Sequence, residues 1–231
     1  MIPWSHIDTA QIPGGGELRL MRRGSEFSIR LGGNELMNSR LSGSEEALAT
    51  LACERIGGRA RPRLLIGGLG MGFTLRAALA ALGPTAQVAV AELVPQVVAW
   101  ARGAMAEVFG GSLDDARLRI DEIDVGAAIA AAASDPNIRY DAILLDVDNG
   151  PDGLSRPSND RLYDSGGLST AYAALRPGGV LAVWSSAPDR DFSKRLRDAG
   201  FRVDELRVRA NGKRTGTRGG ARHVIWMAAR A

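Results

Sequence analysis

The stretch that decides the fold is RLLIGGLGMG, residues 63–72, in which a short apolar strand enters a turn with four glycines. A helical pattern rich in alanine and leucine follows from Phe73 to Leu82, and Gly83-Pro84 ends it. Glycine permits a tight turn and lets backbone N–H groups come close to a ligand. The unit therefore predicts a nucleotide-type ligand site beyond the carboxyl end of the strand.

Apolar strands alternate with helices after this unit. The expected strands are residues 87–91, 117–120, 141–145 and 179–184, and the expected helices are 95–108, 125–133, 169–175 and 192–199. Two last strands, 202–208 and 223–228, follow without a clear helix between them. This alternation predicts an α/β fold with a mostly parallel seven-stranded sheet, helices on both faces and an antiparallel C-terminal hairpin.

The N-terminal part has a different pattern. Residues 17–22 and 26–31 alternate polar with apolar side chains, and glycines lie between and after them. We expect a small β appendage over residues 1–43 and a Rossmann-like catalytic domain over residues 44–231. The domain begins with a helix that Ser42 or Ser44 can cap, and acidic residues in its first turn suit the helix dipole.

The composition is that of an ordinary globular chain. It has 231 residues, of which 45% are hydrophobic and 24% charged, enough for one α/β domain and a small appendage. Cys53 is the only cysteine, which excludes a disulfide framework. No apolar run approaches the ~20 residues that span a bilayer, and the N-terminal segment lacks the pattern of a secretory signal. We therefore expect a cytoplasmic protein without membrane association.

Acidic residues at the strand ends predict a nucleoside cofactor. Glu92 directly follows the strand at 87–91, where an acid can accept both hydroxyls of a ribose. Asp124 follows the third strand and can accept the amino group of adenine, but Asp121 and Glu122 compete for this role, and Asp124 can instead cap the next helix. The expected cofactor-binding residues are Gly67, Gly68, Leu69, Gly70, Gly72, Glu92, Leu93, Asp124 and Asp146.

The segment DVDNGP, residues 146–151, follows the fourth strand. Carboxylates there can attract a cationic amine, deprotonate a nucleophile or bind a metal, and we expect Asp146 and Asp148 to be the catalytic groups. His6 and His223 are the two histidines, and no metal-ligand spacing exists, so no metal site is expected. The expected substrate-binding residues are Asn149, Tyr163 and Trp184, although aromatic residues in such positions are more often core than catalytic.

Four motifs in this order carry a family resemblance: LIGGLGMG at 65–72, AE at 91–92, YDAILLD at 140–146 and LRPGGVL at 175–181. They resemble class I S-adenosylmethionine-dependent transferases, and within that class the spermidine synthase group of aminopropyltransferases. A β appendage before a Ser-Glu-Glu helix is similar to that group as well. The resemblance implies a Rossmann-like class I methyltransferase fold, S-adenosylmethionine or its decarboxylated form as cofactor, and, with the appendage, a homodimer.

Departures from the group's pattern favour another reaction. The group carries an acid inside a GGGDGG turn, facing the amine of decarboxylated S-adenosylmethionine, whereas residues 69–71 here are Leu-Gly-Met. Without this acid, the turn lacks a negatively charged partner for the amine of the decarboxylated cofactor. It also no longer repels the carboxylate of intact S-adenosylmethionine. Asn149 takes the place of a second family acid, and the family's Tyr-His pair falls near Ser44-Glu45. We therefore expect methyl transfer to a small molecule or peptide, with aminopropyl transfer to a diamine as the alternative.

Residues 207–222 are basic and rich in glycine and join the last two strands. Such a segment can fold over the active site and hold an anionic group or an RNA backbone, or it can be a solvated hairpin loop. No aromatic residues interleave with its charges, so a stacking platform for single-stranded RNA is not expected. A third hypothesis for the protein is a non-catalytic scaffold that retains the cofactor and binds a partner through this loop.

Overall fold

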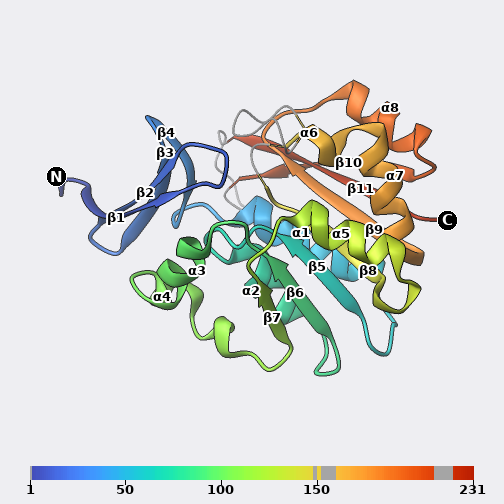
Figure 1. Ribbon diagram of the computed structural model, residues 1–231, viewed down its shortest axis with the longest axis horizontal. Coiled ribbons are helices and arrows are strands. Elements are labelled where there is room, and N and C mark those ends of the chain that lie inside the picture. The colour runs from blue at the N-terminus through green and yellow to red at the C-terminus, as the bar shows by residue number, and fades with distance from the viewer. Residues whose placement is uncertain (1, 148–149, 152–159, 211–220) are drawn as a thin grey trace.

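The computed structural model describes residues 2–147, 150–151, 160–210 and 221–231. The strands of the main sheet are β5 (Arg63–Gly67), β6 (Gln87–Ala91), β7 (Leu118–Asp121), β8 (Tyr140–Leu145), β9 (Leu175–Ser185), β10 (Arg202–Arg209) and β11 (Arg222–Ala229). Within the described residues they form a seven-stranded sheet in the order β10-β11-β9-β8-β5-β6-β7 (Figure 1). The strands from β9 to β7 are parallel, and β11 runs antiparallel to both of its neighbours. The predicted fold is confirmed.

Helices cover both faces of this sheet, because apolar side chains point alternately to either side of its buried strands. On one face, Leu64 and Ile66 pack with α1 (Gly43–Arg55), α2 (Phe73–Ala81), α3 (Pro95–Arg102) and α4 (Ala106–Phe109). On the other, Leu65 shares a core with α5 (Val125–Ser134), α6 (Asp160–Tyr163), α7 (Ser165–Ala174) and α8 (Arg190–Asp198). Among the helices of the described residues, none combines the length and apolar character needed to cross a membrane.

Two predicted helices have different bounds in the structure. The helix expected over 95–108 is divided into α3 and α4, because Gly103 leaves the helical conformation with φ −108° and ψ −104°. The helix expected over 169–175 begins earlier, at Ser165, because Asp164 caps it by accepting a hydrogen bond from the N–H of Gly167 at 2.7 Å. It ends before Leu175, which already belongs to β9 and lies opposite Tyr140 of β8.

A separate four-stranded antiparallel sheet occupies the N-terminal part of the described residues (blue in Figure 1). Its strands are β1 (Ser5–Gln11), β2 (Glu17–Arg23), β3 (Glu26–Leu31) and β4 (Asn34–Asn38). Asp8 of β1 accepts hydrogen bonds from Gln96 Nε2 at 2.6 Å and Trp100 Nε1 at 2.7 Å, both on α3. Leu20 and Ile29 belong to the same core as α1, α2 and α3. The division at residue 43 stays a prediction, since the two parts share this core.

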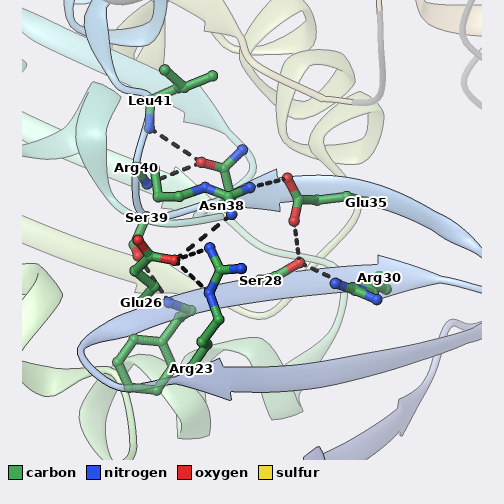
Figure 2. A network of polar contacts seen from close by, with 10 residues as sticks. Arg23, Glu26, Ser28, Arg30, Glu35, Asn38, Ser39, Arg40 and Leu41 are labelled. Atoms are coloured by element: carbon green, nitrogen blue, oxygen red, sulfur yellow. Dashed lines mark hydrogen bonds and ion pairs between the residues drawn. The ribbon is translucent and has the colours of Figure 1, made fainter. Parts of the chain in front are cut away.

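A polar network connects β2, β3 and β4 of this small sheet with the segment that leads into α1 (Figure 2). Glu35 pairs with Arg40 at 2.7 Å, and Arg40 lies 3.7 Å from Glu26. Asn38 Oδ1 accepts hydrogen bonds from the N–H groups of Arg40 at 2.9 Å and Leu41 at 3.1 Å. These bonds fix the turn between β4 and α1, and they thereby place the first turn of α1.

The start of α1 differs from the prediction. Ser42 occupies the N-cap position, but its side chain makes no capping hydrogen bond within the described part of the chain. The Ser44 hydroxyl contacts Glu45 and His223 instead. Capping by Ser42 or Ser44 is therefore wrong, and the hydroxyl of Ser44 joins α1 to β11.

Candidate active site

The glycine turn, residues 67–72, lies between the carboxyl ends of β6 and β8. The N–H of Gly68 donates to the carbonyl of Ala91 at 2.9 Å. The φ of Gly68 is 86°, and a Cβ at this position would come within 2.9 Å of the carbonyl oxygen of Asp146. Glycine alone fits this left-handed conformation and close approach. The turn is thus held against both neighbouring strands, and α2 begins at Phe73 immediately after it.

Glu92 fixes the glycine turn from the end of β6. Its side chain is only 7% exposed. Its Oε2 accepts a hydrogen bond from the N–H of Leu69 and its Oε1 from the N–H of Val94, both at 2.9 Å. Burial raises the pKa of this carboxyl group, while the backbone N–H donors lower it. Each carboxylate oxygen keeps lone-pair capacity for a hydroxyl donor.

A cavity of about 130 Å³ opens beside Glu92, at the carboxyl ends of β5, β6 and β8; we call it the Glu92 pocket. Six of the predicted cofactor-binding residues line it, namely Gly68, Gly70, Glu92, Leu93, Asp124 and Asp146. Leu69 and Gly72 line an adjoining cavity, and Gly67 lies within β5 and lines neither. The structure thus brings together at one sheet edge most of the residues that the sequence predicts for the cofactor.

Asp124 caps α5 and also lines the Glu92 pocket, so its role toward adenine stays a prediction. Its Oδ1 caps α5 by accepting hydrogen bonds from the N–H groups of Gly126 at 2.8 Å and Ala127 at 3.3 Å. The same residue lines the Glu92 pocket. Of its two competitors, Asp121 pairs with Arg119 at 2.9 Å and Glu122 is exposed, and neither lines this pocket. Because capping uses only one carboxylate oxygen, the other stays available for a donor.

Asp146 directly follows β8 and lines both cavities. Its Oδ2 accepts a hydrogen bond from the hydroxyl of Thr74, on α2, at 2.6 Å. Burial raises the pKa of Asp146 to about 7, with a further increase from the charge of Glu45, while the Thr74 hydrogen bond lowers it. A carboxyl group with this pKa can exchange a proton near neutral pH. Asp148 and Asn149, the other residues predicted in this segment, lie outside the described residues.

The adjoining cavity has a volume of about 90 Å³; we call it the Glu45 pocket. Glu45, from the first turn of α1, lines it together with Asp146, and the two pockets share Leu36, Met37, Gly70 and Asp146. From the sequence alone, Glu45 is expected only to suit the dipole of its helix. Its one further signal was the resemblance, which placed a family motif near Ser44-Glu45.

The two aromatic residues predicted to contact substrate lie in different places. Tyr163 is buried in the core on the α7 face, where its ring meets Phe192 edge-on at 5.7 Å and its hydroxyl donates to the carbonyl of Val147 at 3.4 Å. It lines neither pocket. Trp184 lines the Glu45 pocket, and its ring packs edge-on against His223 at 4.7 Å. Only Trp184 is therefore positioned to contact a ligand there.

A larger cavity, of about 450 Å³, lies at the opposite ends of the strands. Several charged side chains at its wall already have partners. Arg117 pairs with Asp115 at 2.7 Å, and Arg119 pairs with Asp121. The described residues contain no group of three side chains able to hold a metal ion. We place the candidate active site at the two smaller pockets, since the glycine turn and the carboxylates of Glu45 and Asp146 meet there.

The curated proteins that match this chain are named polyamine aminopropyltransferase. No protein-family model matches the chain. Polyamine aminopropyltransferase of Mycobacterium tuberculosis strain H37Rv is 30% identical over 172 residues, which cover 74% of this chain and 31% of the relative. The protein of the same name from Corynebacterium efficiens is 29% identical over 174 residues, with the same shares covered. The chain therefore spans about a third of the length of the curated relatives it matches.

Solved structures define the class of the fold. Spermidine synthase from Thermotoga maritima matches with a TM-score of 0.75 and 17% identity, over 98% of this chain and 73% of that one. Human methyltransferase-like protein 13 in complex with SAH matches with a TM-score of 0.54 and 21% identity, over 80% and 78%. The chain thus has a class I methyltransferase-like fold. Within that class, its resemblance to the spermidine synthase-like branch is confirmed by the curated relatives and by this match over almost the whole chain.

The prediction of methyl transfer is wrong. The curated relatives are named polyamine aminopropyltransferase and the matching structures include spermidine synthases, so the findings support the alternative. The prediction rested on the absence of an acid from residues 69–71. Glu45 lines the pocket beside that turn, however, so a carboxylate reaches this place from α1.

Proposed function

We propose that the protein transfers an aminopropyl group from decarboxylated S-adenosylmethionine to a primary amine of a small diamine or polyamine. The observation that carries the proposal is the meeting of Asp146, with a pKa of about 7, and Glu45 in a pocket next to the Glu92 pocket. The name of the curated relatives supports it. Because the chain spans about a third of those relatives, its own activity has to be measured.

The Glu92 pocket fits the nucleoside part of this co-substrate. Glu92 can accept the two ribose hydroxyls, since its Oε2 and Oε1 bind the N–H groups of Leu69 and Val94 and keep further lone-pair capacity. Asp124 can accept the adenine amino group through the oxygen that does not cap α5. Leu93 and Val125 add apolar surface against which a purine can pack. These are the residues that would hold the co-substrate.

The proposed reaction needs orientation and a proton acceptor. When bound, the co-substrate supplies a carbon that is made electrophilic by the adjacent sulfonium. The acceptor nitrogen bonds to this carbon, while the carbon–sulfur bond breaks and its electron pair stays on sulfur, which leaves methylthioadenosine. The nitrogen attacks as the neutral amine and afterwards loses one proton. Asp146, between the two pockets, can accept this proton because its pKa is close to neutral.

The test is turnover with defined substrates. Purified protein is incubated with decarboxylated S-adenosylmethionine and a series of linear diamines of increasing chain length, and methylthioadenosine is quantified by chromatography. We expect one methylthioadenosine for each aminopropyl group transferred, and no methylated amine when intact S-adenosylmethionine replaces the co-substrate. Folded protein that forms no methylthioadenosine with any diamine would contradict the proposal.

We also propose that the protein is a homodimer. The resemblance to the spermidine synthase group and the small N-terminal sheet support this assembly. Size-exclusion chromatography with light scattering measures the mass of the particle directly. A mass of one chain at micromolar concentration would contradict the proposal.

A further inference from the structure

Trp184 differs from the other buried tryptophans in its indole N–H group. Trp100 Nε1 donates to Asp8 at 2.7 Å, and Trp226 Nε1 donates to Ser193 at 2.8 Å. The indole N–H of Trp184 has no hydrogen-bond acceptor within the described part of the chain, although this residue is only 9% exposed. A buried donor without an acceptor is unfavourable. A ligand that supplies an acceptor at this place would therefore gain affinity.

The side chain of Trp184 belongs to the wall of the Glu45 pocket. Its ring packs edge-on against His223 at 4.7 Å, and His223 Nδ1 lies 2.8 Å from the hydroxyl of Ser44, so the direction of the indole is fixed. Glu45 and Asp146 line the same cavity, yet neither carboxylate accepts a hydrogen bond from the indole. The N–H group is thus left for a molecule bound in the pocket.

The proposed co-substrate offers no hydrogen-bond acceptor for this N–H group. Its adenine and ribose belong beside Glu92, in the pocket that Trp184 does not line. Its chain ends in an ammonium group, which contains donors only. A plain diamine does not help either, because its attacking nitrogen uses its one lone pair on the carbon of the co-substrate and its second nitrogen is an ammonium group near neutral pH. The missing atom is therefore an oxygen on the chain of the amine substrate.

The two carboxylates of the pocket determine the kind of oxygen. A carboxylate on the ligand would be repelled by Glu45 and Asp146. A hydroxyl group fits both sides, because its oxygen accepts from the indole while its proton is donated to a carboxylate. Asp146 Oδ2 accepts from Thr74 at 2.6 Å, and lone pairs remain on this carboxylate for a second donor.

We propose that Trp184 determines the choice of amine substrate, and that its indole N–H donates to a hydroxyl group on the chain of a hydroxylated diamine. This inference rests on the proposed function. Asp146 lines both pockets, so an amine that gives its proton to Asp146 extends its remaining chain into the Glu45 pocket, toward Trp184. The hydroxyl group takes no part in the transfer and leaves the reaction unchanged.

The test is turnover with pairs of amines that differ in one hydroxyl group. The pairs are diaminopropane with diaminopropanol, and putrescine with hydroxyputrescine. Formation of methylthioadenosine from decarboxylated S-adenosylmethionine gives kcat/KM for each amine, and the quotient within a pair is the hydroxyl preference. For wild type, we expect a hydroxyl preference of about tenfold in at least one pair, because the hydroxyl group pairs a donor that otherwise stays unsatisfied.

Trp184→Phe keeps an aromatic ring in the wall of the pocket and removes the N–H group. We expect its hydroxyl preference to be about tenfold lower than that of wild type. A hydroxyl group also makes neighbouring amines less basic, but this property of the substrate is the same for both proteins. A general loss of activity or stability cancels as well, since each preference is a quotient within one protein. Equal preferences of wild type and Trp184→Phe would overturn the inference.

Trp226→Phe is the matched control. Trp226 lies on β11, is fully buried and lines neither pocket, and its N–H group already has its acceptor in Ser193. The hydroxyl preference of this variant should equal that of wild type, even where its stability is lower. The same loss of preference in both variants would overturn the inference, because it would indicate a general effect of core packing.

Two further outcomes separate the inference from the proposed function. If wild type forms methylthioadenosine from plain and hydroxylated diamines with equal kcat/KM, the inference fails and the proposed function stands. If folded wild type forms no methylthioadenosine from any amine of the two pairs, the proposed function fails and the inference fails with it.

Discussion

Asp141 and Asp146 lie near the two ends of the same strand, and their surroundings are opposite. Asp141, in β8, is fully buried, and two guanidinium groups neutralise it. Its Oδ1 accepts from Arg59 at 2.7 Å, and its Oδ2 accepts from Arg176 at 2.9 Å and from the N–H of Arg63 at 2.7 Å. This carboxylate joins β5, β8 and β9 at their amino-terminal ends, and no part of it is left for a ligand.

Asp146 has a hydroxyl group and a second carboxylate as its neighbours. Thr74 supplies one hydrogen bond, and Glu45 supplies a like charge. One residue type thus serves two purposes at the two ends of a single strand. A carboxylate surrounded by cations stabilises the fold, whereas one that faces another carboxylate in a cavity is available for a cationic ligand and a proton.

The largest effect that we predict is on stability, from Asp141→Asn. The substitution removes the negative charge between two guanidinium groups, so the free energy of unfolding should fall by about 3 kcal/mol. Urea denaturation followed by circular dichroism measures the change. A loss below about 1 kcal/mol would contradict the prediction, because it would indicate that water stabilises the two guanidinium groups nearly as well as Asp141 does.

The matched substitution at the other end of the strand, Asp146→Asn, should act on turnover. The amide keeps the acceptor for Thr74 but cannot take a proton, so we expect the rate of methylthioadenosine formation to fall about 100-fold. The affinity for methylthioadenosine should be retained, which calorimetry checks. Full activity of this variant would remove Asp146 from the mechanism.

Asp146→Asn should also change stability. In contrast to Asp141→Asn, it should raise the free energy of unfolding above neutral pH, and by a smaller amount. The pKa of Asp146 is about 7 in the folded protein, whereas an unperturbed Asp has a pKa of 3.8. Between these two pH values the native state therefore holds a proton that the unfolded chain has lost. The contribution of Asp146 to the free energy of unfolding therefore falls as pH rises through this window.

Asp146→Asn removes this dependence. From pH 5 to pH 8, the variant should gain about 2.5 kcal/mol relative to wild type. Urea denaturation at both pH values provides the measurement. A difference between the two proteins that stays constant with pH would show that Asp146 has an ordinary pKa.

Local patterns in the sequence predicted the fold and the meeting of the glycine turn, Glu92 and Asp124 at one cavity. The glycine turn, Glu92 and Asp124 each follow a strand directly, and the carboxyl ends of parallel strands meet at one edge of the sheet. Their meeting is therefore a consequence of topology, and the sequence contains that topology in the spacing of its strands.

The Glu45 pocket depends on contacts between segments that are distant in the sequence. Glu45 has the ordinary appearance of an acid in the first helix turn, and Ser44 that of a capping residue. Only the packing of α1 beside α2 and β11 shows that Glu45 meets Asp146 and that Ser44 meets His223. The absence of an acid from residues 69–71 therefore misled the prediction of the reaction, because the nearby carboxylate comes from another element.

Calorimetry of wild type with two ligands tests the charge of the Glu45 pocket directly. Decarboxylated S-adenosylmethionine has an ammonium group at the end of its chain, and the intact form has a carboxylate beside that ammonium. We predict that the decarboxylated form binds about tenfold more tightly or better, because Glu45 and Asp146 repel the carboxylate. Equal or tighter binding of intact S-adenosylmethionine would show that the pocket does not repel a carboxylate.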